Sequence, residues 1–188
     1  MSADKQVERK DNLTGYLAIA AGIVLSAAVL FGSTGPDWVL NERAFIPYLN
    51  CETIYERVFS IGLTVCGTLV AIFGFDLIWL RRGDVLSATG LVFLIAGLIA
   101  MNITAFVSGW DLQGALVTAM VLTVLLGTIL MTVNNWMEGR IFVGGISLVL
   151  IFSFLALLAA NGTSEFWIPA TYGFSAWMII QGLNFLFK

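Results

Sequence analysis

The chain has 188 residues, of which 59% are hydrophobic and 11% charged, with a net charge of −3 and a mean hydropathy of +0.94. Soluble domains carry about 25% charged residues, so the composition excludes an ordinary soluble domain. Histidine is absent and only two cysteines are present. These counts exclude histidine-ligated haem, zinc and copper sites and an iron–sulfur cluster held by four cysteines.

Six apolar runs follow one another along the chain, each near the ~20 residues that an α-helix needs to cross a hydrocarbon core. The runs are continuously apolar, which predicts helices rather than the alternating pattern of membrane strands. The sequence therefore predicts an all-α membrane protein with a single domain over residues 1–188, a six-helix transmembrane bundle. The expected spans are 14–32, 58–80, 86–107, 113–133, 141–160 and 167–186.

Lysine and arginine set the predicted orientation, because loops that stay in the cytoplasm are enriched in them. With the N-terminus inside, the cytoplasmic side holds Lys5, Arg9, Lys10, Arg81, Arg82, Arg140 and Lys188, and the outer side holds Arg43 and Arg57. Both termini are therefore expected in the cytoplasm, and the protein is expected to be multi-pass in the cell membrane. A cleaved signal peptide is the competing interpretation of the first run, whose apolar core is long for that role.

The longest connection, residues 33–57, is predicted to lie outside the membrane and to contact a ligand or partner, because binding residues concentrate in loops on a rigid scaffold. Before the second run, Ile54, Val58 and Ile61 recur at helical spacing, so the second helix is expected to begin near Glu52. Two residues of the next external loop are added to the candidates. The candidate contacts are Trp38, Asn41, Glu42, Arg43, Tyr48, Glu52, Tyr55, Glu56, Arg57, Trp110 and Asp111.

The sequence shows no catalytic constellation, and the chain is predicted not to be an enzyme. Glu52 and Glu56 lie four residues apart on one helical face, where a carboxylate pair could do acid–base work or bind a cation. Exposed loop carboxylates more often serve solvation, so an enzyme acting on lipid is kept only as an alternative. No catalytic residue, metal site or cofactor is expected, and the acidic outer side does not favour nucleic acid as a partner.

Polar residues inside the predicted spans are the usual pointers to an ion or substrate path. Those considered are Asp76, Asn102, Gln181 and Asn184. No charge falls at the centre of a span. The leading prediction is therefore a membrane protein without a catalytic centre that binds membrane lipid, a partner membrane protein or another copy of itself at its outer face. A small-molecule channel or carrier and an accessory subunit of a larger complex are the alternatives.

Small residues repeat every four positions in three runs and predict closely packed helices. The repeats are Ala18, Gly22 and Ser26; Ala96, Ala100, Thr104 and Ser108; and Ala115, Ala119, Thr123 and Gly127. Cys51 and Cys66 are expected to lie roughly 20 Å apart, too far for a disulfide. Asn161 begins a glycosylation sequon on an expected outer loop. Trp177 falls within the last span, away from the interfacial positions that tryptophan prefers.

Two stretches carry a family resemblance. Trp38, Asn41 and Ala44, followed by VFSIGLTVCGTLVAIFGFDLI, and later FWIPATYGFSAWMIIQGLNFLF, with Ile168-Pro169 and Trp177, resemble an uncharacterised six-helix membrane family of archaea and bacteria. That family is distantly similar to the damage-regulated autophagy modulator proteins. The chain departs from the family pattern at 46–49, at Ala170 and at Trp110-Asp111, where the family favours a Ser-acid-x-Gly element, an acid and a histidine. The resemblance implies a six-helix topology and no established activity.

Overall fold

The computed structural model describes residues 3–35, 51, 53–80, 85–104, 110–159 and 164–187. Within these residues every regular element is an α-helix, which confirms the predicted all-α class. Each expected span overlaps one helix, and the second helix begins close to Glu52, as predicted. The helices are α1 (Ala3–Gly32), α2 (Ile54–Leu80), α3 (Val85–Thr104), α4 (Trp110–Met137), α5 (Ile141–Ala159) and α6 (Ser164–Leu186).

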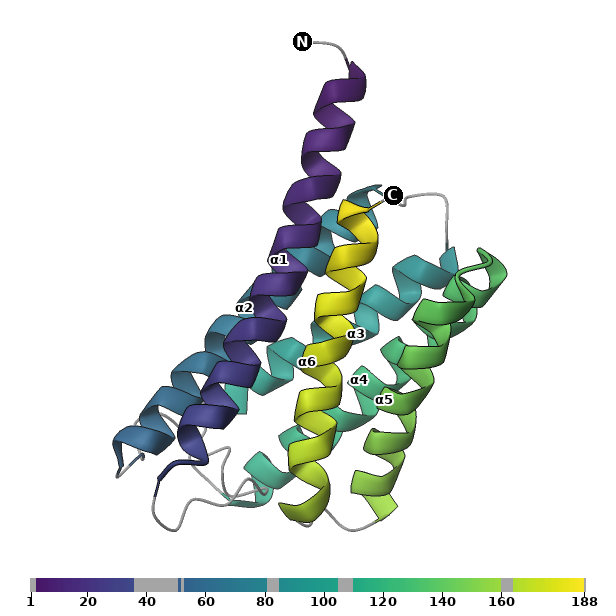
Figure 1. Ribbon diagram of the computed structural model, residues 1–188. Coiled ribbons are helices and arrows are strands. Elements are labelled where there is room, and N and C mark those ends of the chain that lie inside the picture. The colour runs from purple at the N-terminus through teal and green to yellow at the C-terminus, as the bar shows by residue number, and fades with distance from the viewer. Residues whose placement is uncertain are drawn as a thin grey trace.

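The helices run alternately up and down, so that α1 begins and α6 ends at the same end of the molecule (Figure 1). We call this end, where α2 and α4 also end, the terminal end. The other end, where α1, α3 and α5 end, is the distal end. The first turns of α1 extend beyond the other helices at the terminal end (Figure 1). The helix therefore continues past the apolar run that predicted it.

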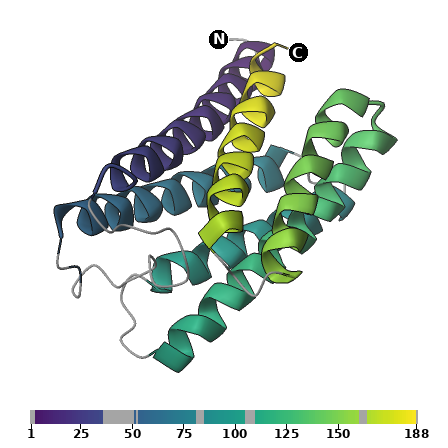
Figure 2. The same ribbon diagram turned by 60° about the horizontal axis from the view of Figure 1, so that its bottom comes forward.

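The six helices close into a ring. The main contacts join each helix to its neighbours in the chain, and α1 to α6. Figure 2 shows the first and last helices side by side, as does Figure 1. Because every helix has two partners in the ring, each presents one face to a shared interior and another to the outside.

Glycines on α1 and α6 allow these helices to approach closely. A Cβ atom added at Gly182 would lie 2.5 Å from the carbonyl oxygen of Gly15, and one added at Gly22 would lie 2.5 Å from that of Ser175. Gly15 and Gly22 are seven residues apart, close to two turns, as are Ser175 and Gly182, so the contact repeats along one face of each helix. The ring is closed by direct backbone contact. The buried positions of Ala18 and Gly22 agree with the predicted packing stripe of the first span.

A second pair of glycine-rich faces joins α3 to α4, and here the predicted stripes hold only in part. A Cβ atom at Gly127 would lie 2.7 Å from the carbonyl oxygen of Gly90, and Gly97 faces Thr123. Ala96 and the first two members of the α4 stripe, Ala115 and Ala119, are exposed instead. The spacing of small residues indicates a face, but which face meets a neighbour depends on how the two helices are rotated.

The outside of the ring is as apolar as its interior. Among the described residues, three helical segments are long and apolar enough to cross a membrane, Asn12–Gly32, Ile54–Ile78 and Ala115–Met137, and two shorter apolar helices are Val85–Ala100 and Ile141–Ala156. Every helix also exposes large apolar side chains, for example Ile23, Ile72, Val92, Leu122, Phe152 and Leu183. An outward apolar surface on all six helices is what a hydrocarbon environment requires and what water penalises.

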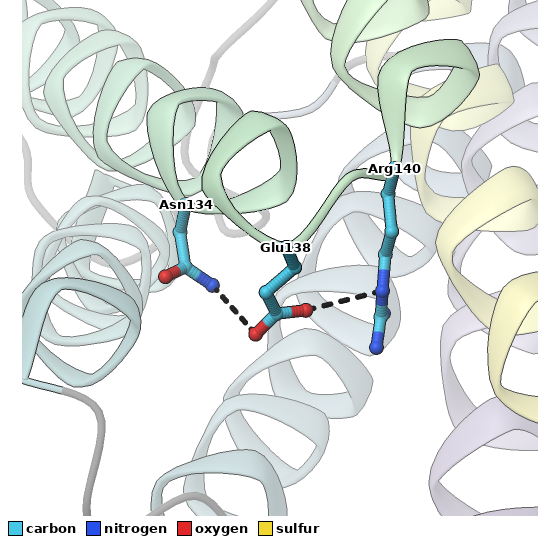
Figure 3. Close-up of polar contacts among 3 residues, drawn as sticks. All are labelled: Asn134, Glu138 and Arg140. Carbon is cyan, nitrogen blue, oxygen red and sulfur yellow. Dashed lines mark hydrogen bonds and ion pairs between the residues drawn. The ribbon is translucent and has the colours of Figure 1, made fainter.

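The α4–α5 connection is a tight turn at the terminal end. Gly139 has a positive φ of 76°, and its N–H and that of Arg140 donate to the carbonyl oxygens of Trp136 and Asn135. This pairing caps the end of α4 and favours glycine at the left-handed position. Glu138 accepts from Asn134 Nδ2 at 3.1 Å and pairs with Arg140 Nε at 3.1 Å (Figure 3). The turn is therefore held from both sides by one carboxylate.

Candidate functional site

A partly open cavity of about 50 Å³ lies between the helices of the ring, towards the distal end. All six helices contribute to its wall, and among the described lining residues only Thr171 has a polar side chain. The lining residues are Leu25, Phe59, Leu63, Leu98, Met120, Val121, Val124, Phe154, Ala170, Thr171 and Phe174. A water-sized probe occupies about 10–15 Å³, so the cavity has room for a short stretch of hydrocarbon chain. Its described lining side chains provide almost no hydrogen-bonding groups for water.

On the terminal side of the cavity, the interior of the ring contains one buried tryptophan, Trp177. Residues seven positions from the cavity lining, close to two turns and about 10 Å along each helix, lie on the same interior faces. They are Ala18, Val70, Leu91, Thr128, Ser147 and Trp177, and none is more than 1% exposed. Trp177 is by far the largest, and its Nε1–H donates to Ser147 Oγ at 2.7 Å. The hydroxyl of Ser147 in turn donates to the carbonyl oxygen of Val143. We call these six residues the Trp177 layer. The hydrogen bond to Ser147 and the full burial account for the position of Trp177 within the last helix, which anchoring at the membrane interface did not.

Closer to the terminal end the interior becomes polar. Asn135 follows Thr128 by two turns on α4, and Gln181 and Asn184 follow Phe174 and Trp177 by two turns on α6. Asn135 and Gln181 are only 3% and 2% exposed. The buried amide nitrogens of Asn135, Gln181 and Asn184 have no hydrogen-bond partner. A buried unpaired donor costs about 1–3 kcal/mol, so this polar layer offers donors for a hydrogen-bond acceptor.

Three of the predicted loop contacts, Tyr55, Glu56 and Arg57, stabilise the start of α2. The ring of Tyr55 packs against Phe31 at a centroid distance of 5.5 Å and lies over Gly35, where a Cβ atom would come within 2.7 Å of it. Arg57 Nε donates to the carbonyl oxygen of Cys51 at 3.3 Å. Each contact joins chain segments at the distal end. They fix the position at which the second helix starts.

Glu56 forms a capping box with Thr53. The N–H of Thr53 donates to Glu56 Oε2 at 3.0 Å, and the N–H of Glu56 donates to Thr53 Oγ1 at 3.2 Å. Together these bonds satisfy two donors that a helix start would leave unpaired. Burial raises the pKa of the nearby Cys51 thiol, with Glu56 adding to the shift and Arg57 opposing it. Neither Cys51 nor Cys66 forms a disulfide bond.

We expect Thr53→Ala and Glu56→Ala each to lower the free energy of unfolding by about 1 kcal/mol, because each removes one half of the capping box. Glu56→Gln should retain most of the stability, since a glutamine oxygen can also accept the Thr53 N–H. The measurement is reversible unfolding in mixed micelles. Loss of a bound molecule from Glu56→Gln at unchanged stability would instead show that the carboxylate charge serves binding.

The other predicted loop contacts lie outside the described residues or at the start of α4. Trp38, Asn41, Glu42, Arg43, Tyr48 and Glu52 are outside the described residues, as is Asn161. Trp110 and Asp111 form the first turn of α4. The predicted outer binding surface therefore stays a prediction.

The four residues of the predicted polar path fall at two ends of the ring. Asp76, Gln181 and Asn184 lie towards the terminal end, and Asn102 lies at the distal end of α3. Between them stands the Trp177 layer, in which no side chain is more than 1% exposed. The continuous polar path through these four residues stays a prediction. Among the described residues no three His, Cys, Asp or Glu side chains are grouped so that they could hold a metal ion.

Sequence reasoning missed the cavity and the Trp177 layer. A signal was present in the seven-residue series Val121, Thr128, Asn135 and Ala170, Trp177, Asn184, each running from apolar to polar along one helix face. The series could show that these residues share a face. It could not show that the two faces meet inside a ring.

Comparison with known proteins gives no relative: the chain matches no protein-family model, no curated protein and no solved structure. The resemblance to the uncharacterised six-helix membrane family stays a prediction.

Proposed function

We propose that the protein crosses the cell membrane six times, with both termini in the cytoplasm, and that its interior cavity holds the hydrocarbon part of a membrane lipid or another apolar molecule. It acts in this proposal as a binding protein without a catalytic centre. The observation that carries the proposal is the cavity itself, an apolar space walled by all six helices.

The membrane part of the proposal is supported by the outward surface and by the distribution of basic residues. Large apolar side chains are exposed on every helix. Seven of the nine lysines and arginines stand in the sequence beside those helix ends that lie at the terminal end: Lys5, Arg9 and Lys10 in the first part of α1, Arg81 and Arg82 after α2, Arg140 before α5 and Lys188 after α6. This bias matches the excess of positive charge in cytoplasmic loops. The terminal end is then cytoplasmic and the cavity lies nearer the outer surface.

The binding part is supported by the shape and chemistry of the interior. A densely packed helical bundle has few voids larger than a water molecule, yet here a void persists where six helices meet. Its described lining residues are apolar except for Thr171, and apolar cavities favour apolar molecules over water. Phe59, Phe154 and Phe174 give it flat apolar surfaces against which a hydrocarbon chain can pack.

A small-molecule channel or carrier is the second candidate function, and the polar layer at the terminal end favours it. Unpaired amide donors in a membrane interior suit an uncharged solute with acceptor oxygens. The Trp177 layer closes the ring between this layer and the cavity, so conduction requires a rearrangement of α5 and α6. Binding in the cavity requires none, and we therefore place it first.

The test is photolabelling in lipid nanodiscs with a phosphatidylcholine that carries a diazirine on one acyl chain. We expect labelling, assigned to single residues, at the buried Val121 and Phe174, in addition to the labelling of outward side chains such as Leu122 by the surrounding lipid. Ala170→Phe, which fills the cavity, should abolish the labelling of Val121 and Phe174. Ala176→Phe is the matched control, because Ala176 lies on the same helix but is exposed. Equal interior labelling of the two variants would contradict the proposal.

A further inference from the structure

An unpaired hydrogen-bond acceptor lies next to the cavity. The side-chain Oδ1 of Asn102 is buried and has no hydrogen-bond partner, although the residue as a whole is partly exposed. Asn102 follows Leu98, which lines the cavity, by four residues, so the two side chains lie on the same face of α3. It also follows Ile95 by seven residues, and Ile95 packs against Gly74 of α2. Asn102 therefore lies on the face of α3 that carries Leu98 and Ile95, one turn distal to the cavity wall.

The chemistry of this position selects a ligand. A buried carbonyl-type oxygen without a partner is costly, and a donor supplied by a ligand removes that cost. The cavity wall is otherwise apolar, so the remainder of the ligand must be hydrocarbon. The Asn102 side chain is uncharged. It can therefore pair with a neutral hydroxyl group, but it cannot compensate the charge of a buried ammonium group, so a hydroxyl is favoured.

We propose that the cavity binds a long-chain alcohol, a neutral lipid whose hydroxyl group donates to Asn102 Oδ1 and whose hydrocarbon chain enters the cavity past Leu98. This inference deepens the proposed function and rests on it. The four residues from Leu98 to Asn102 correspond to about 6 Å along α3, so the hydroxyl would lie a few methylene groups from the cavity centre. The hydroxyl would point to the distal end and the hydrocarbon chain to the middle of the ring. In the proposed orientation a lipid of the outer leaflet is arranged in the same way, with its polar group towards the distal end.

The test uses dodecan-1-ol and 1-methoxydodecane as competitors of the diazirine phosphatidylcholine in nanodiscs. The two probes share one hydrocarbon chain and differ in the hydroxyl donor. For each variant we measure the ratio of the competing concentration of the ether to that of dodecan-1-ol. We expect this ratio to be about fivefold higher for the native protein than for Asn102→Leu, which corresponds to one net hydrogen bond. Comparing two variants in identical nanodiscs removes the difference in how the probes partition into lipid.

The outcomes separate this inference from the proposed function. If both probes compete with interior labelling and Asn102→Leu leaves their ratio unchanged, the hydroxyl assignment is wrong while the cavity still binds hydrocarbon. If the native protein shows no interior labelling at all, the proposed function fails and the inference with it. A preference for the alcohol that disappears in Asn102→Leu, with interior labelling retained, supports both.

Discussion

Replacing Trp177 with alanine is expected to lower the free energy of unfolding by about 3–5 kcal/mol, the cost of truncating a fully buried large side chain. Trp177 is 0% exposed and fills the ring where Ala18, Thr128 and Ser147 leave space for it. Inside a membrane this cost comes from lost van der Waals contacts rather than from water, since lipid is as apolar as the core. The measurement is unfolding by sodium dodecyl sulfate in mixed micelles.

Trp177→Phe and Ser147→Ala separate packing from hydrogen bonding. Ser147→Ala leaves the ring of Trp177 in place but removes the acceptor of its Nε1–H, so the expected loss is about 1–3 kcal/mol for a buried unpaired donor. Trp177→Phe removes the donor as well and should cost less than Trp177→Ala. If Trp177→Ala and Trp177→Phe had the same free energy of unfolding, the packing of a large side chain at position 177 would not stabilise the protein, and the description of the Trp177 layer would be wrong.

Adding one methyl group at Gly182 is the second large expected effect. Gly182→Ala places a Cβ atom 2.5 Å from the carbonyl oxygen of Gly15. Backbone atoms on both helices cannot move aside as a flexible side chain could, so α1 and α6 must separate. Overpacking of this kind costs about 1–3 kcal/mol, and we expect the loss to fall in the upper part of that range.

Gly145→Ala is the matched control for this substitution. Gly145 is also helical, but a Cβ atom added there would meet nothing within 4 Å. Alanine is the better helix former, so Gly145→Ala should be neutral or stabilising by up to about 1 kcal/mol. Both variants are compared by unfolding in the same micelles. Equal losses at the two positions would show that α1 and α6 do not meet at Gly15 and Gly182.

The helices could be predicted from the sequence because the signal for each is local. Each apolar run is bounded by charged, proline or glycine residues, and each became one helix. The start of α2 had a further local signal in Thr53 and Glu56, which stand three residues apart as a capping box requires. Considering Glu56 together with Glu52 as a carboxylate pair obscured its role as a cap.

The ring could not be predicted in the same way, because it depends on how the helices are rotated about their axes. In a soluble bundle the apolar stripe of each helix shows which face is buried, but here both faces are apolar. Ala96 and Ala119 have the spacing of a packing face and lie outside, while Gly90 and Gly127 form the contact. The cavity follows from the relative rotation of all six helices, so no single run could indicate it.

The polar residues show the same limit. Asn102 and Gln181 could be identified from sequence as polar groups within apolar runs, and both prove to have buried unpaired atoms. A continuous path between them was one alternative. The buried Trp177 layer lies between them along the helices, and the sequence could not show this because Trp177 and Ser147 come from different helices.

The most direct test of the central claim is a crystal structure of the protein grown in a lipidic mesophase. We predict elongated density inside the ring, between Phe59, Val121 and Phe174, that does not connect to any side chain and ends beside Asn102. Side chains of α4 and α6 that fill this space, or a ring that is open between α1 and α6, would contradict it.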